Sequence, residues 1–197
     1  MKVLILQGSP KLEGNTEQLL KPMVAELEAA GHQTEQIGLY GLEIKGCIAC
    51  RTCQKDWTKF GCVLHDDGQM IFDRVLEADV LILATPIYSW YCTAPMKAIL
   101  DRLVYGMNKY YGDEKGPSLW EGRDLALVMT CGYEPVKGTD LFVAGMERYA
   151  KHSRLNYLGS HGARHRGYDM VFMDEEKEAA ARNFARELIG KMERKRL

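Results

Sequence analysis

The chain has 197 residues, of which 46% are hydrophobic and 27% charged, as in an ordinary globular domain. This composition argues against a disordered or fibrous chain, and we treat residues 1–197 as a single domain. Lysine and arginine number 26 against 27 acidic residues, so the net charge of −1 predicts no nucleic-acid partner. No apolar run approaches the ~20 residues that cross a bilayer, so we expect no membrane partner.

The amino-terminal apolar segment is too short for a signal peptide, because it runs directly into a glycine turn at Gly8. We therefore expect a cytoplasmic protein. In that reducing compartment, the six cysteines are expected to be free, catalytic or metal-binding rather than paired in disulfides.

Short apolar segments alternate with amphipathic ones, which predicts an α/β fold with a parallel sheet and helices on both faces. The predicted strands are 2–7, 33–39, 79–85, 124–130 and 155–160. The predicted helices are 16–30, 69–78, 94–105, 139–151 and 174–194. The last predicted helix begins with acidic residues. Basic residues lie at its carboxyl end and just beyond it, as the helix dipole favours, namely Lys191, Arg194, Lys195 and Arg196.

Two segments depart from this regular pattern. The first helix should take Asn15 as its N-cap, and Pro22 inside it predicts a kink or a later start, because proline has no backbone N–H. Residues 46–67 show neither helical nor strand periodicity, and we interpret them as a cysteine-rich insertion within the domain.

The first motif, GSPKLEGNT at residues 8–16, joins the first predicted strand to the first helix. Ligands of an open parallel sheet bind beyond the carboxyl ends of its strands, where a phosphate meets helix N-terminal amides. The motif offers glycines for close backbone approach and polar groups on Ser9, Lys11, Asn15 and Thr16. Its spacing excludes a Walker P-loop and a GxGxxG loop, and it predicts an anion cradle. The alternative is a tight turn without a ligand.

The second motif, TPIYSWY at residues 85–91, follows the third predicted strand, which is expected across the topological switch point from the first. Three aromatic side chains within four residues suit contact with a planar heteroaromatic ligand, and loop amides can hydrogen-bond its ring nitrogens. Ordinary packing or a dimer contact is the alternative.

The third motif places Cys47, Cys50, Cys53 and Cys62 within sixteen residues. Overlapping CxxC spacings resemble a loop around a four-iron four-sulfur cluster, whereas zinc sites usually separate two CxxC pairs by a longer loop. Unligated reduced thiols in a surface loop are the interpretation that we favour. Asp66 and Asp67, which follow, are expected to cap the next helix.

Two histidines lie in the segment SHGARHRG after the fifth predicted strand. We expect a loop there, and we interpret His161 and His165 as part of a basic patch for an NADPH phosphate or a partner subunit rather than as metal ligands.

The first two motifs, together with Ala94–Pro95–Met96–Lys97–Ala98 and Asp101–Arg102, resemble the NAD(P)H-dependent FMN reductase family of flavodoxin-like proteins, through about residue 132. The resemblance implies a three-layer sandwich whose five-stranded parallel sheet has the order 2-1-3-4-5. It also implies an FMN site in which the phosphate is held by Ser9, Lys11, Gly14, Asn15 and Thr16. The flavin ring would be lined by Pro86, Ile87, Tyr88, Ser89 and Trp90 and closed in by Thr130, Cys131, Gly132 and Tyr133.

The same resemblance implies an FMN-dependent oxidoreductase that passes electrons from NAD(P)H to a small acceptor, such as a quinone, a nitro or azo compound or free flavin. No side chain is required as a proton donor. A homodimer or tetramer is implied, for which we expect Trp57 or Trp120 at the interface. An iron-sulfur flavoprotein branch of the family carries a similar cysteine pattern, so a 4Fe-4S electron carrier is one alternative. A non-catalytic flavodoxin-like binding module is the other.

Overall fold

The computed structural model describes residues 1–167 and 169–194, so the predicted helix-end residues Lys195 and Arg196 lie outside it. Its centre is a five-stranded parallel sheet with the order β2-β1-β3-β4-β5, which confirms the predicted order. The strands are β1 Lys2–Gln7, β2 Gln33–Gly38, β3 Val80–Pro86, β4 Asp124–Cys131 and β5 Asn156–Arg164.

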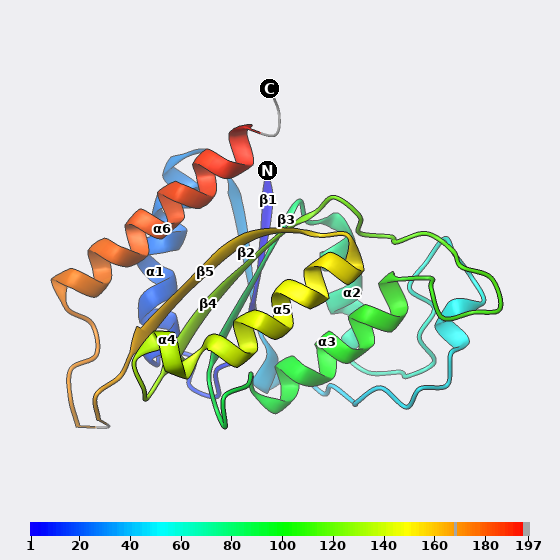
Figure 1. The fold of residues 1–197 in the computed structure, drawn as a ribbon, viewed down its shortest axis with the longest axis horizontal. Helices are drawn as coiled ribbons and strands as arrows, with labels where there is room; N and C mark the ends of the chain where they lie inside the picture. The colour runs from blue at the N-terminus through cyan, green and yellow to red at the C-terminus, as the bar shows by residue number, and fades with distance from the viewer. Residues whose placement is uncertain (168, 195–197) are drawn as a thin grey trace.

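Helices cover both faces of the sheet (Figure 1). One face carries α1 Asn15–Ala29 and α6 Glu175–Arg194. The other carries α2 Gly68–Glu77, α3 Ala94–Met107 and α5 Asp140–Ser153, and a single short turn, α4 Pro135–Gly138, precedes α5. This is the predicted three-layer sandwich. No helix in the described ranges is both long enough and apolar enough to cross a membrane.

The central strands divide their side chains between two hydrophobic clusters. In β3, Val80 and Ile82 pack toward α1 and α6, whereas Leu81 and Leu83 pack toward α2, α3 and α5. The alternation follows from the period of two in a strand, and both faces are apolar because both are covered by helices. A rigid sheet therefore presents the carboxyl ends of β1, β3 and β4 at one edge.

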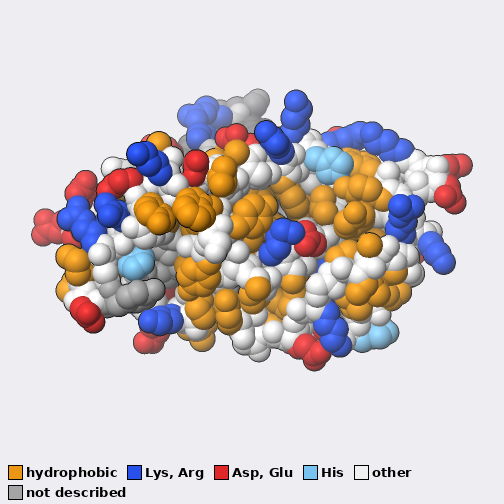
Figure 2. Space-filling model, turned by 60° about the horizontal axis from the view of Figure 1, so that its bottom comes forward, with side chains coloured by type: hydrophobic (Ala, Val, Ile, Leu, Met, Phe, Trp, Pro, Cys, Tyr) orange, Lys and Arg blue, Asp and Glu red, His pale blue; other side chains and the backbone are white. Residues whose placement is uncertain are grey.

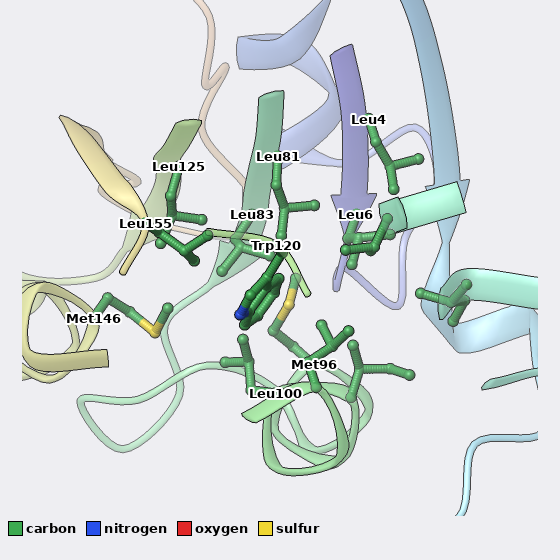
Figure 3. Close-up of a cluster of buried hydrophobic side chains, with 14 of the residues drawn as sticks. Leu4, Leu6, Leu81, Leu83, Met96, Leu100, Trp120, Leu125, Met146 and Leu155 are labelled. Atoms are coloured by element: carbon green, nitrogen blue, oxygen red, sulfur yellow. The ribbon is translucent and has the colours of Figure 1, made fainter. Parts of the chain in front are cut away.

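Trp120 lies in the centre of the leucine-rich cluster (Figure 3). Its side chain is 1% exposed, and its Nε1–H donates to Asn108 Oδ1 at 2.9 Å. The expectation that Trp120 forms a subunit interface is therefore wrong, since a fully buried ring offers no surface to a partner. Trp57, the other residue expected there, is 41% exposed.

Helix α1 begins one residue earlier than predicted. Gly14 is the N-cap and Asn15 the first helical residue, so the expected N-cap at Asn15 is wrong. Pro22 does not delay the start; the helix continues through it to Ala29, with Pro22 buried. Packing of the apolar face against β1 and α6 outweighs the one backbone hydrogen bond that proline removes.

Strand β5 continues beyond its predicted end, because it pairs with β4 as far as the register Cys131↔Arg164. His161 therefore lies in a strand and stacks on Phe184, with ring centroids 5.6 Å apart, and the expected loop begins only at His165. Burial lowers the pKa of His161.

The cysteine-rich insertion is irregular, as predicted, apart from the short 3-10 helix η2 Thr52–Gln54; another, η1 Leu39–Gly41, follows β2. The insertion lies beside the end of α3, at the far side of the molecule from α6 (Figure 1).

Candidate flavin site and cysteine pocket

A pocket of about 550 Å³ opens where β1, β3 and β4 end. It brings together every residue that the sequence assigned to a flavin site, namely Ser9, Lys11, Gly14, Asn15, Thr16, Pro86, Ile87, Tyr88, Ser89, Trp90, Thr130, Cys131, Gly132 and Tyr133. The rest of its lining is Pro10, Gly138, His165, Gly167 and Met170, which the sequence analysis did not assign to the flavin.

The loop from β1 to α1 forms one wall. Ser9 Oγ donates to Lys11 O at 3.0 Å and lies 3.2 Å from Lys11 N, which donates to it. No side chain caps the start of α1, so its first amides are available to a ligand. A Cβ on Gly14 would lie only 2.9 Å from Lys11 Cβ, so the tight turn needs glycine here. This wall fits a phosphate group.

Buried hydroxyls tie the three loops of the pocket together. Thr16 Oγ1 and Thr130 Oγ1 are 3.1 Å apart, which joins the start of α1 to the end of β4. Thr93 Oγ1 donates to Gly8 O at 2.7 Å, and Thr93 N donates to Thr85 Oγ1 at 3.3 Å. The loop after β1 and the loops after β3 and β4 are therefore held in one fixed arrangement.

The loop after β3 is a two-residue turn that presents aromatic side chains. Tyr88 and Tyr91 exchange backbone hydrogen bonds of 2.9 and 3.0 Å, and Ser89 and Trp90 between them have φ of 50° and 62°. Two positive φ values identify a type I′ turn. Tyr88 and Trp90 are 51% and 46% exposed, whereas Tyr91 packs edge-on against Phe142. Two of the three aromatic residues thus face the pocket, and the third belongs to the core.

The loop after β4 brings a further ring to the rim. Tyr133 stacks on Trp90 at a centroid distance of 5.8 Å and an interplanar angle of 12°. Arg164 fixes the loop, because its Nε donates to Gly132 O at 3.1 Å and its guanidinium pairs with Glu134. Two nearly parallel rings at a pocket mouth suit a flat aromatic ligand.

Cys131 lies beneath this rim rather than in it. Its thiol is buried, and burial raises its pKa, so it is not poised as a nucleophile. His165 N donates to Cys131 O at 2.8 Å, which places His165 in the lining of the pocket.

The four cysteines of the insertion line a second, much smaller pocket of about 20 Å³. Cys50 is exposed, and the amide of Thr52 lowers the pKa of its thiol. Cys53 is buried, and burial raises the pKa of its thiol. In residues 1–167 and 169–194, no three His, Cys, Asp or Glu side chains are grouped so that they could hold one metal ion.

This donor set fits a polynuclear cluster better than a single ion, because its four thiols surround a pocket instead of converging on a point. The packed pocket has room for about one water molecule. A cluster held by these four thiols would therefore have to widen the pocket.

The two aspartates at the end of the insertion bind elements other than the start of α2. Asp67 occupies the N-cap position but makes no capping hydrogen bond; its carboxylate accepts from Glu43 N at 2.7 Å. Asp66 accepts from Gly68 N at 3.0 Å and forms a buried ion pair with Arg102. The predicted cap is therefore wrong for Asp67, and Asp66 instead anchors the insertion to α3.

Residues 1–137 match the sequence model of the family described as NADPH-dependent FMN reductase. The chain belongs to this family.

Relatives and solved structures agree with that assignment. An iron-sulfur flavoprotein of Archaeoglobus fulgidus is 36% identical over 107 residues, which are 54% of this chain and 47% of the relative. The chain thus matches about half the length of such relatives. An NAD(P)H:quinone oxidoreductase from Methanothermobacter marburgensis superimposes with a TM-score of 0.74 over 95% of this chain and 98% of its own, at 19% identity. A flavodoxin of Streptococcus pneumoniae gives 0.59 over 97% and 99%, at 16% identity. Both structures establish the flavodoxin-like fold.

Sequence reasoning missed the parts of the pocket that come from outside the family motifs. Thr93, which joins two loops of the pocket from behind, looks like an ordinary helix N-cap in the sequence. Gly138 lies in a short turn that no sequence periodicity indicates. Gly167 and Met170 follow β5, and they reach the pocket only because β5 is longer than expected. The basic character of the segment around His165 was the one signal available.

Proposed function

We propose that the protein is an FMN-dependent oxidoreductase that takes electrons from NAD(P)H and passes them to a small acceptor, such as a quinone, a nitro or azo compound or a flavin. The observation that carries this proposal is that an uncapped helix terminus and two exposed aromatic loops share one 550 Å³ pocket. Membership of the FMN reductase family supports the same cofactor.

The residues have separate tasks in this proposal. Ser9, Asn15 and the first amides of α1 bind the phosphate, with Lys11 adding positive charge. The loops that carry Trp90 and Tyr133 bind and orient the ring. FMN bound there would supply the redox chemistry, hydride acceptance from the nicotinamide and electron release to the acceptor. Because the rim is open and aromatic, nicotinamide and acceptor can use the same face in turn.

The decisive experiment is an absorbance spectrum of the anaerobic, FMN-loaded protein before and after one equivalent of NADPH. We expect the flavin band to bleach, and we expect a quinone added afterwards to restore it. NADH in a parallel sample distinguishes the preferred donor. A flavin band that stays oxidised with both nucleotides, while dithionite bleaches it, would remove the reductase proposal and leave the flavin site intact.

We further propose that the chain forms a homodimer or tetramer and that no nucleic acid or membrane is its partner. Hydrophobic side chains gather on the face shown in Figure 2, which is seen when the bottom of the molecule in Figure 1 is turned toward the viewer. Large exposed apolar residues include Leu12, Tyr88, Trp90, Tyr133, Val136 and Leu141. Such a patch favours association between proteins. Location in the cytoplasm stays a prediction of the sequence.

We also propose a second function, that of an iron-sulfur flavoprotein. In it, the thiolate ligands of a 4Fe-4S cluster would be Cys47, Cys50, Cys53 and Cys62. The supporting observation is that all four thiols line one pocket. A bound cluster would supply one-electron transfer beside the two-electron chemistry of the flavin.

Iron and acid-labile sulfide content of anaerobically purified or reconstituted protein tests this second function. We expect about four of each per chain, with visible absorbance that persists after the flavin is extracted. Replacing Cys53 by Ser should abolish both signals, while Cys92→Ser, which alters a cysteine outside the insertion, should not. A reconstituted protein without iron would leave the four residues as ordinary thiols.

A further inference from the structure

Two buried cations border the cysteine pocket. The first is Arg102 of α3, whose side chain is 1% exposed. One edge of its guanidinium faces Asp66, with Nη1 at 2.8 and 2.9 Å from the carboxylate oxygens. The other edge faces the pocket, with Nη2 3.5 Å from Cys62 Sγ. Arg102 therefore presents an N–H donor to the fourth cysteine while its charge is paired from the opposite side.

The second cation is Lys109, which follows α3 and is fully buried. Its Nζ donates to the carbonyl oxygens of Cys53 at 2.6 Å, Lys59 at 2.7 Å and Phe60 at 3.2 Å. Cys53 and Phe60 both line the cysteine pocket. The ammonium thus holds the backbone that forms one wall of that pocket.

Lys109 differs from Arg102 in its charge partners. Among the described residues, no carboxylate lies within ion-pair distance of its Nζ; the acid that acts on it from farther away, Asp56, is itself paired with Lys59. A buried charge held only by neutral groups is costly unless an opposite charge lies nearby. The adjacent pocket is where a negative group would offset that cost, and four thiolates around a metal cluster would supply it.

We propose that Arg102 and Lys109 offset the negative charge of a cluster held by the four cysteines and raise its reduction potential. The proposal rests on the cluster function given above. Arg102 acts through an N–H···S hydrogen bond to Cys62, and Lys109 acts through its positive charge behind Cys53. Net charge and hydrogen bonds to sulfur are the factors by which a protein sets such potentials. Reduction adds one negative charge, so nearby cations favour the reduced state.

The test compares Lys109→Met with wild type in the full-length, FMN-containing protein after anaerobic reconstitution. Methionine has a similar length and removes the charge. We expect unchanged iron content and at least a tenfold smaller equilibrium constant for one-electron reduction of the cluster, about 59 mV lower in potential. A redox titration followed by the paramagnetic resonance of the reduced cluster measures this. Lys21→Met, an exposed position on α1, removes the same charge far from the insertion and should leave the potential unchanged.

Each outcome separates the charge effect from the cluster itself. Wild-type protein that takes up no iron overturns both proposals. A Lys109→Met protein that carries the cluster at an unchanged potential overturns only the present one. If Lys109→Met folds but holds no iron, Lys109→Arg decides: recovery of the cluster supports a role for the charge, and continued loss shows that Lys109 only shapes the loop.

Discussion

Replacing Arg102 by Met is expected to lower the free energy of unfolding by about 3–5 kcal/mol, because it leaves the Asp66 carboxylate buried without its counter-ion. The side chain of Asp66 is 0% exposed, so water cannot replace the guanidinium. The variant also removes the contact between Arg102 and the ring of Phe72, 5.0 Å from its centroid. Urea denaturation followed by circular dichroism measures the loss.

The same pair predicts a change in pH dependence. Burial pushes the pKa of Asp66 upward, but hydrogen bonds from the Lys45 amide and from Arg102 outweigh it and hold the pKa below its ordinary 3.8. A lowered pKa in the folded state contributes stability above the ordinary pKa, and this is lost as the pH falls through the folded value. Without Arg102 the pKa of Asp66 rises, so the stability deficit of the variant relative to wild type should be largest near neutral pH and should shrink as the pH falls and Asp66 becomes protonated.

Two variants control the Arg102 experiment. Arg148→Met alters an exposed arginine of α5 and should change stability by no more than about 0.5 kcal/mol. The double variant Arg102→Met/Asp66→Asn removes both charges, keeps an oxygen acceptor for the Lys45 and Gly68 amides, and should recover part of the lost stability. If Arg102→Met behaves like Arg148→Met, the buried pair does not anchor the insertion in the way that we describe.

Addition of FMN to the FMN-free protein, at about a thousand times its dissociation constant, is expected to raise the free energy of unfolding by about 4 kcal/mol. The reason is that the cradle and the rim exist only in the folded chain, so FMN binds the native state selectively. Thermal unfolding at increasing FMN concentration measures the effect. Protein that is colourless and gains no stability would point instead to a non-catalytic flavodoxin-like module.

Variants of the anion cradle at residues 8–16 test whether FMN binds through these residues. Ser9→Ala removes the hydroxyl that holds the Lys11 backbone, and Asn15→Ala removes an amide at the start of α1. Each should weaken FMN binding by about tenfold to a hundredfold, since a hydrogen bond to a charged group contributes about 1.5–3 kcal/mol. Asn183→Ala, at an exposed position on α6, is the matched control and should retain FMN like wild type. Unchanged FMN retention in both cradle variants would remove the phosphate assignment.

The sheet and the flavin pocket were predictable because their signals are local. The run Val80–Leu81–Ile82–Leu83 is apolar on both faces, which is typical of a strand covered by helices on each side, and its cluster memberships alternate accordingly. The glycine-containing loop after β1 and the aromatic loop after β3 lie at strand ends, where the topology of a parallel sheet brings them together.

Of the cysteine pocket, only the four cysteines were predictable. Arg102, within α3, and Lys109, just after it, look like ordinary charged residues, and nothing in their spacing indicates that both are buried. Their role depends on where the irregular insertion folds back, and no periodicity specifies the path of such a segment. The extension of β5 was missed for a related reason, since Gly159 and Gly162 weaken its strand pattern and pairing with β4 overrides it.

The turn at Ser89 and Trp90 has a consequence for which residues selection keeps at the rim of the pocket. An Asn-Gly pair would adopt two successive left-handed backbone conformations at far less steric cost than serine followed by tryptophan. Selection for folding alone would tend to replace this pair, and laboratory screens for heat tolerance should do so readily. If Trp90 is retained through such a screen, the reason would be selection for ligand binding, because the strained backbone at this position favours its replacement.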